Sequence, residues 1–207
     1  MIGRRMFAIV ILAAGASKRM GRPKMVLPWA DTTIVGHQIR QWILCGADQI
    51  AVVCPPGPHP LLDELDRLGF PSEHRITNPH PENGMFSSIQ EAARWPGWHE
   101  NISHWVISLG DQPQLGRETL VRLLQAAARD PDQIWQPAWN QRPAHPVVLP
   151  ARAFHQLARS PAIHFKSFLH SQADALRLCY CEDPGLALDI DTPGDYEKLR
   201  SFQKKTP

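Results

Sequence analysis

The chain has 207 residues, of which 43% are hydrophobic and 20% are charged, as in ordinary globular proteins with room for one large domain. A formal net charge of +2 is too small for binding nucleic acid through bulk electrostatics, so any phosphate site must depend on locally placed cations. The apolar run 7–14 is too short to span a membrane, and no signal-peptide pattern is visible. We therefore expect a cytoplasmic protein with one domain over 1–207, ordered from about 6 to 203, and no nucleic-acid or membrane partner.

Predicted strands and helices alternate along the chain. Residues 7–13 (FAIVILA) are continuously apolar and rich in β-branched side chains, which is typical of a strand buried on both faces. Thr32 or Thr33 opens a helix that ends at Gly46, and Thr192 caps a C-terminal helix. In chain order we predict strand 7–13, helix 33–46, strand 49–54, helix 61–68, strand 75–78, helix 84–94, strand 102–109, helix 117–129, strands 133–138 and 146–149, helices 151–157 and 165–170, strand 175–181 and helix 193–202.

This alternation predicts βαβ units and therefore an α/β protein with a mostly parallel sheet flanked by helices. In such sheets, ligands bind beyond the carboxyl ends of the strands. The loops 14–24, 55–60 and 110–113 follow three of the predicted strands. We expect the first and third of these loops to hold the functional residues, because they combine small, basic and acidic side chains.

The first loop favours binding of an anion. Small residues follow the strand, and they let backbone N–H groups approach an anion closely. Arg19 and Lys24 add two cations that can reach a polyphosphate. The loop has neither the GK[ST] ending of a Walker A motif nor a GxGxxG pattern. From these residues alone, a polyphosphate site and an ordinary turn with solvated cations are equal alternatives.

Acidic residues at two places suggest a metal site. Asp111 follows a buried strand, and a carboxylate there can hold Mg²⁺, which prefers oxygen ligands and bridges phosphates. Turn chemistry is the alternative, because Gly-Asp-Gln-Pro also suits a helix-initiating turn. Asp189 and Asp191 both precede the C-terminal helix, and their spacing places them on one side of an extended segment. Asp195 is expected in the first turn of that helix.

Five segments resemble the motifs of a known family, in the same order along the chain. LAAGASKRMGRPK (12–24) resembles the signature LAAGxSxRMGxxK of the MobA-like nucleotidyltransferases, and within that family it is most similar to the molybdopterin cytidylyltransferases. The other segments resemble the family's GMxxSI, GDQP, GHPV and DIDTPEDY; here they read GMFSSI (84–89), LGDQP (109–113), RPAHPV (142–147) and DIDTPGDY (189–196). One departure is Ala144, where many relatives have glycine.

The resemblance implies a three-layer Rossmann-like nucleotidyltransferase fold in which the first loop wraps the triphosphate of a nucleotide. It implies catalytic roles for Arg19, Lys24 and Asp111, and Mg²⁺ on Asp111 and Asp189, with Asp191 in reserve. His145 would face the acceptor, either binding its phosphate or shaping its pocket. The nucleotide-binding residues that it implies are Leu12, Ala13, Ala14, Gly15, Arg19, Lys24, Asn83, Gly84, Ser87, Ser88 and Asp111.

The implied reaction is Mg²⁺-dependent transfer of NMP from an NTP to the phosphate of molybdopterin, or of the molybdenum cofactor, with release of pyrophosphate. The pair Ala13-Ala14 favours CTP, because guanylyl-transferring relatives usually read LAGG. Alternatives are GTP, or another phosphorylated acceptor such as a sugar phosphate. A different class is a non-catalytic insertion chaperone that binds the finished cofactor. In either class, a recipient molybdoenzyme is a possible partner.

Overall fold

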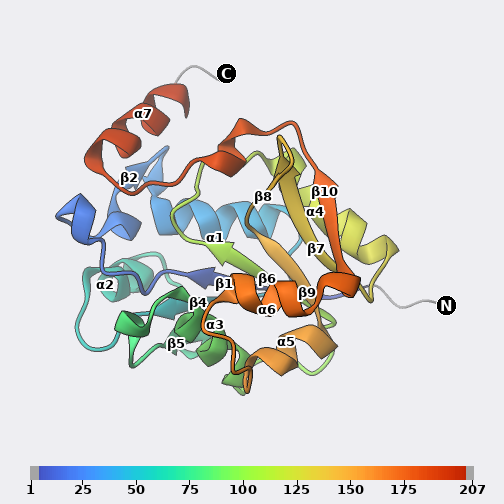
Figure 1. Cartoon of the computed structure of the whole chain (residues 1–207). Helices are drawn as coiled ribbons and strands as arrows, with labels where there is room; N and C mark the ends of the chain where they lie inside the picture. The colour runs from blue at the N-terminus through green and yellow to red at the C-terminus, as the bar shows by residue number, and fades with distance from the viewer. Residues whose placement is uncertain (1–4, 204–207) are drawn as a thin grey trace.

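The computed structural model describes residues 5–203, which contain one sheet of eight strands (Figure 1). The strands lie in the order β10-β7-β9-β6-β1-β4-β5, and β8 pairs with β7. Neighbours along this order are parallel except at β9, which runs antiparallel to β6 and β7. The strands are β1 (Phe7–Leu12), β4 (Gln49–Cys54), β5 (Arg75–Thr77), β6 (His104–Leu109), β7 (Ile134–Trp139), β8 (Arg142–Pro143), β9 (Val147–Pro150) and β10 (Leu176–Tyr180). This arrangement confirms the predicted α/β class with a mostly parallel sheet.

Helices cover both faces of the sheet. One buried cluster joins the strands to α1, α2, α4 and α7, and a second joins them to α3, α5 and α6. Figure 1 shows α3, α5 and α6 together on one side of the sheet. The helices are α1 (Ile34–Leu44), α2 (Pro60–Arg67), α3 (Met85–Arg94), α4 (Arg117–Arg129), α5 (Ala151–Leu157), α6 (Phe165–Ser171) and α7 (Pro193–Gln203).

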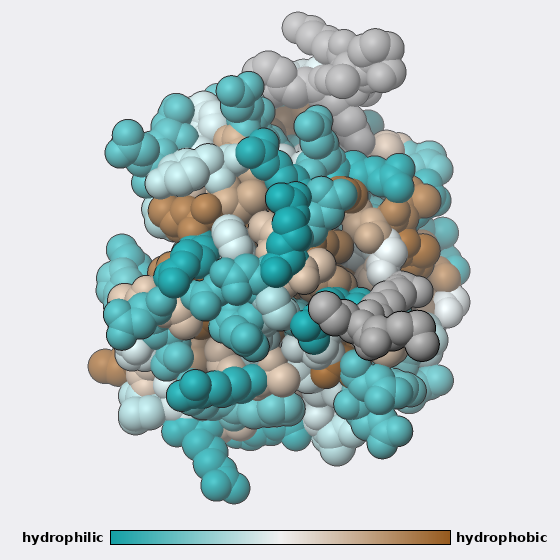
Figure 2. Space-filling view, turned by 90° about the vertical axis from the view of Figure 1, so that its right-hand side faces the viewer, coloured by the Kyte–Doolittle hydropathy of each residue, from teal (hydrophilic) through white to brown (hydrophobic). Residues whose placement is uncertain are grey.

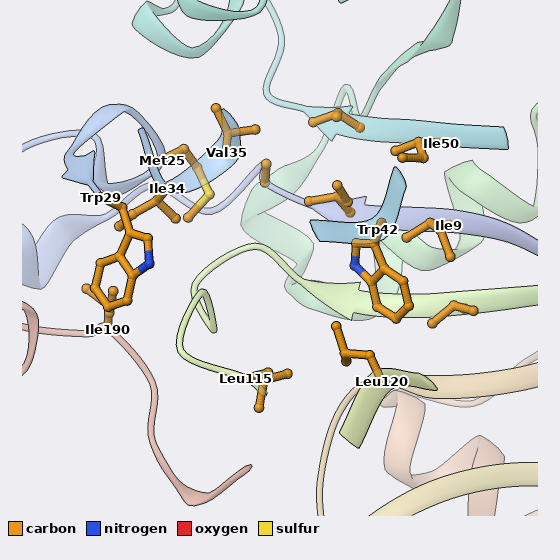
Figure 3. Close-up of a cluster of buried hydrophobic side chains, with 14 of the residues drawn as sticks. Ile9, Met25, Trp29, Ile34, Val35, Trp42, Ile50, Leu115, Leu120 and Ile190 are labelled. Carbon is orange, nitrogen blue, oxygen red and sulfur yellow. The ribbon is translucent and has the colours of Figure 1, made fainter. Parts of the chain in front are cut away.

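The position of β1 inside the sheet, with helices on both faces, accounts for its apolar sequence. Ile9 and Ile11 belong to the first cluster, Ala8 and Val10 belong to the second, and all four are fully buried. Complete burial of an isoleucine side chain contributes about 1.5–3 kcal/mol, so a polar residue on either face would be costly. Figure 3 shows part of the first cluster, in which Ile9 lies near Trp42.

Most predicted elements match the structure closely. The bounds of α4 and α5 are those predicted, and Thr33 caps α1 by accepting a hydrogen bond from the Gly36 amide. The strand predicted from residue 102 begins two residues later, at His104. The sequence analysis missed the short ribbon β2 (Pro28–Trp29) and β3 (Thr32–Thr33), because two-residue strands leave no periodic pattern.

The segment around α7 returns to the N-terminal part of the fold. Tyr196 Oη donates to the Pro28 carbonyl at 2.6 Å, and Ile190 is buried in the same cluster as Trp29 (Figure 3). The Thr192 hydroxyl accepts a hydrogen bond from the Asp195 amide at 3.2 Å, and Asp195 accepts one from the Thr192 amide at 2.9 Å. This reciprocal cap places Asp195 in the first helical turn, as predicted.

The surface shown in Figure 2 is largely hydrophilic, with hydrophobic residues in small, separate patches. Within residues 5–203, no helix is both long enough and apolar enough to cross a bilayer.

Candidate functional site

The loop that follows β1 begins at the carboxyl edge of the sheet. The Ala13 amide still donates to the Val53 carbonyl at 3.0 Å, whereas the amides of Ala14 and Gly15 have no acceptor within residues 5–203. Ser17 lies in the left-handed region (φ 49°), and its hydroxyl accepts a hydrogen bond from the Lys24 amide at 3.2 Å. The loop thus presents unpaired N–H donors and fixes the backbone from which Lys24 extends.

The two cations of this loop contact acidic residues from distant parts of the chain. Lys24 Nζ lies 2.5 Å from Asp111 Oδ2, 3.0 Å from the Ile190 carbonyl oxygen and 3.6 Å from Asp191 Oδ1. Arg19 Nη2 lies 2.8 Å from Asp191 Oδ2. The Lys24 and Asp111 side chains are only 13% and 20% exposed, so their ion pair is weakly screened by water. The structure therefore brings together Arg19, Lys24 and two of the predicted carboxylates.

Asp111 owes its place to a close backbone approach at Gly110. The Gly110 amide donates to the Leu12 carbonyl at 3.0 Å, which joins the loop after β6 to the end of β1. A Cβ on residue 110 would lie 2.7 Å from the Leu12 carbonyl oxygen and 2.8 Å from Met25 Sδ. Only glycine fits there without displacing the backbone.

We therefore expect Gly110→Ala to move Asp111 away from Lys24 and to destabilise the protein by about 1–3 kcal/mol, as overpacking of a tight site does. Denaturant unfolding of the variant measures the loss of stability. Gly15→Ala is the matched control, because a Cβ at residue 15 meets no atom within 4 Å. An unchanged unfolding midpoint for Gly110→Ala would contradict the close approach.

Asp189 and Asp111 form the pair of carboxylates that suits a divalent cation. Gln112 Nε2 donates to Asp189 Oδ1 at 2.7 Å, and the Ile190 amide donates to the Asp111 carbonyl at 3.1 Å, so the two segments are joined side by side. Burial raises the pKa of Asp189, and the negative charges of Asp111 and Asp191 raise it further. Asp189 as a whole residue is exposed to solvent. The protein that surrounds its carboxylate nevertheless disfavours the charged form.

Oxygen atoms remain available for such a cation. Asp111 Oδ1 and Asp189 Oδ2 have no hydrogen-bond or ion-pair partner in the described part of the chain, and hard cations prefer carboxylate oxygens. Asp191 differs, because each of its oxygens faces a cationic side chain. The donor set thus fits Mg²⁺ or a similar ion better at Asp111 and Asp189 than at Asp191.

Lys24, Asp111 and Asp189 border a cleft of about 300 Å³ at the carboxyl edge of the sheet. Gly84, at its other side, has φ 87° and precedes the N-terminus of α3. Arg19, Asn83, Ser87 and His145 are not among the residues of the cleft wall, and Arg19 is largely exposed. The wall consists of Leu12, Ala13, Ala14, Gly15, Lys24, Met25, Pro81, Gly84, Met85, Ser88, Leu109, Asp111 and Asp189.

Asn78 organises the α3 side of the cleft, and the sequence analysis did not identify it. It is fully buried, and its Nδ2 donates to the hydroxyls of Ser87 (2.8 Å) and Ser88 (2.9 Å). Its Oδ1 accepts a hydrogen bond from the His80 amide at 2.9 Å. The Ser87 hydroxyl in turn donates toward the Gly84 carbonyl, so its contacts are within the loop. A polar residue directly after strand β5, at the carboxyl edge, is the signal that could have revealed Asn78.

His145 lies beside the site rather than in the cleft wall. Its Nδ1 is 3.4 Å from the Ile107 carbonyl oxygen, and its ring centroid is 5.9 Å from that of Phe165. Burial lowers the pKa of His145, although the nearby negative charge of Asp111 opposes this shift. The lowered pKa favours the neutral ring, and a neutral ring with its proton on Nδ1 toward Ile107 would have no N–H left for a phosphate.

Comparison with known proteins identifies the family. Residues 9–176 match the model of the MobA-like NTP transferase domain. The chain is 28% identical to nicotine blue oxidoreductase of Paenarthrobacter nicotinovorans (88% of this chain, 91% of that protein) and 27% identical to molybdenum cofactor cytidylyltransferase of Escherichia coli K12 (90% and 92%). It is 29% identical to molybdenum cofactor guanylyltransferase of Pseudomonas aeruginosa LESB58 (90% of each).

Solved structures agree on the fold. Rv0371c from Mycobacterium tuberculosis superposes with a TM-score of 0.74 at 26% identity, over 97% of this chain and all of that one. A second structure of Rv0371c, in complex with manganese, has a TM-score of 0.68 at 23% identity, over 96% of this chain and all of that one. A nucleotidyl transferase from Methanothermobacter has a TM-score of 0.79 at 19% identity, over 98% and 99%, and shows the fold alone. Because the family model covers most of its length, the chain belongs to the family of MobA-like NTP transferase domains.

Proposed function

We propose that the protein is a Mg²⁺-dependent nucleotidyltransferase that moves CMP from CTP to the phosphate of molybdopterin, or of the molybdenum cofactor, and releases pyrophosphate. The observation that carries this proposal is that Lys24, Asp111 and Asp189 line the same cleft as Ala14 and Gly15, whose amides are unpaired within residues 5–203. Cations and N–H donors suit a triphosphate, and two carboxylates suit the metal that accompanies it. An enzyme that consumes an NTP is expected in the cytoplasm.

In the proposed mechanism, an acceptor phosphate oxygen attacks the α-phosphorus of the nucleotide, and the bond to pyrophosphate breaks. The acceptor monoester is already ionised at neutral pH, so no strong general base is required. Lys24 and Arg19 neutralise charge on the departing pyrophosphate, while the amides of Ala14 and Gly15 hold its oxygens. Asp111 and Asp189 would hold Mg²⁺, which supplies charge neutralisation at the reacting phosphate. Positioning and electrostatics then contribute most of the rate enhancement.

The relatives support both the chemistry and the acceptor, but they differ in the nucleotide. Two of them are named for transfer of cytidylyl or guanylyl groups to the molybdenum cofactor. The pair Ala13-Ala14, buried at the start of the cleft, is the feature that favours CTP over GTP. His145, whose Nδ1 faces the Ile107 carbonyl oxygen and which is not part of the cleft wall, is proposed to shape the acceptor pocket rather than to bind phosphate. A third relative, nicotine blue oxidoreductase, is of another class and supplies the competing function.

A pyrophosphate-release assay tests the proposal. The full chain is incubated with Mg²⁺ and each of the four NTPs, with molybdopterin, with a sugar phosphate and with no acceptor. Release that requires CTP and molybdopterin supports the proposal. Release with GTP changes the nucleotide, and release with the sugar phosphate changes the acceptor.

No release in any combination would overturn the transferase proposal. Molybdenum-cofactor binding without turnover would then favour a non-catalytic chaperone that serves a recipient molybdoenzyme. Oxidation or reduction of nicotine blue would instead favour the oxidoreductase class.

A further inference from the structure

The contact between Lys24 and Asp111 conflicts with binding of a divalent cation to Asp111 during the proposed reaction. The Lys24 ammonium group contacts Asp111, the carboxylate proposed to hold the metal, at 2.5 Å. Two further contacts, to the Ile190 carbonyl and to Asp191, hold it in that position. A divalent cation on the same carboxylate would lie within a few ångströms of this ammonium group, and like charges at that distance repel strongly where water is scarce.

We propose that Lys24 acts as the counter-ion of Asp111 and thereby makes binding of the divalent cation dependent on the nucleotide. This inference rests on the proposed function, and it goes beyond that function by assigning Lys24 a second, opposing role at the metal site. Without a polyphosphate, Lys24 competes with the cation for Asp111. A triphosphate offers Lys24 another partner, and its departure frees Asp111 for the cation that the nucleotide carries.

Asp191 is the positioning residue in this scheme. One of its oxygens contacts Arg19 at 2.8 Å, and the other lies 3.6 Å from Lys24. It therefore holds both cations of the first loop near the cleft, where phosphate oxygens can take them over. The coupling is reciprocal by thermodynamic necessity: whatever factor the nucleotide adds to cation affinity, the cation adds to nucleotide affinity.

Two charge-removing variants of the same loop separate this role from a general electrostatic effect. Lys24→Met removes the ammonium group that contacts Asp111. Lys18→Met removes an equal charge from an exposed side chain that has no ion pair within residues 5–203. Mn²⁺ is the probe, and the concentration of free Mn²⁺ is followed by electron paramagnetic resonance in titrations of the full chain without nucleotide.

We expect Lys24→Met to bind Mn²⁺ about tenfold more tightly than the wild type, because a weakly screened like charge has been removed. Lys18→Met should stay within about twofold, because exposed charges are screened. Equal affinities for the wild type and Lys24→Met would overturn the inference, and so would an equal gain in Lys18→Met. If Lys24→Met does not melt as a folded protein, Lys24→Gln replaces it, since its amide retains a donor for the Ile190 carbonyl.

The outcome is independent of the proposed function, because the titration contains neither nucleotide nor acceptor. A protein that shows the gain in Mn²⁺ affinity but releases no pyrophosphate keeps the competition between Lys24 and the cation for Asp111 and loses the transferase. One that releases pyrophosphate without the gain loses only this inference.

Discussion

Asp111→Asn should reduce pyrophosphate release at least about a thousandfold, which corresponds to roughly 4 kcal/mol of transition-state stabilisation. The amide has nearly the shape of the carboxylate but carries no charge, so it holds a divalent cation much more weakly and forms no ion pair with Lys24. Lys24 would keep two partners, the Ile190 carbonyl and Asp191, and is not left as an isolated buried charge. We therefore expect the free energy of unfolding to fall by only about 1 kcal/mol.

Initial rates with CTP and acceptor, together with thermal melts, check this prediction. The matched control is Asp31→Asn, which removes a carboxylate from an exposed ion pair with Arg40; neither residue belongs to the cleft wall. Near-normal turnover by Asp111→Asn would remove Asp111 from the proposed machinery. A melting temperature lowered by more than about 10 °C would show that the variant loses turnover because its fold is destabilised.

Asp189→Asn should also lose most of the turnover, but it should gain stability instead of losing it. Burial and the charges of Asp111 and Asp191 hold the pKa of Asp189 above its ordinary value, so its ionisation opposes folding. The folded state then retains its proton at pH values where the unfolded chain has lost it. The stability of the wild type should therefore decrease as the pH rises from the ordinary Asp value through the raised one.

The variant lacks this ionisation and should melt higher than the wild type at pH 7, but not at a pH below the ordinary Asp value. Melting curves between about pH 3 and pH 8 measure the difference. Asp183→Asn is a useful contrast, because the Asp183 side chain accepts hydrogen bonds from the Gly116 amide and the Thr119 hydroxyl and should be needed for stability. A lower melting temperature for Asp189→Asn at pH 7 would contradict the view that ionisation of Asp189 opposes folding.

The sheet and its helices were largely predictable because the hydrophobic pattern within each segment indicates its secondary structure. The continuous apolar run of β1 and the helical spacing of apolar residues in α4 show within each segment which side chains are buried. The antiparallel direction of β9 was not predictable in this way. A four-residue apolar strand has the same pattern in either direction, and its direction depends on the path of the neighbouring chain.

The site was predictable as a set of residues but not as a set of contacts. The resemblance pointed to Lys24, Asp111 and Asp189, and these residues line one cleft. It did not indicate that Lys24 contacts Asp111 or that Arg19 contacts Asp191, because pairings across such sequence distances depend on the whole fold. Asn78 was missed for a related reason: its importance comes from three hydrogen-bond partners that only the folded chain assembles.

The return of the C-terminal segment to the first loop has a consequence for how the protein is made. Arg19 and Asp191 meet although nearly the whole chain separates them, and Asp189 lies beyond the region that the family model covers. Because the ribosome delivers the N-terminal part first, the β1 loop emerges long before its acidic partners. A nascent chain that has already formed β1, β4 and β6 therefore still lacks Asp189. The proposed metal site thus depends on a residue made after β10, so a protein truncated after β10 would keep every strand of the sheet and lack Asp189.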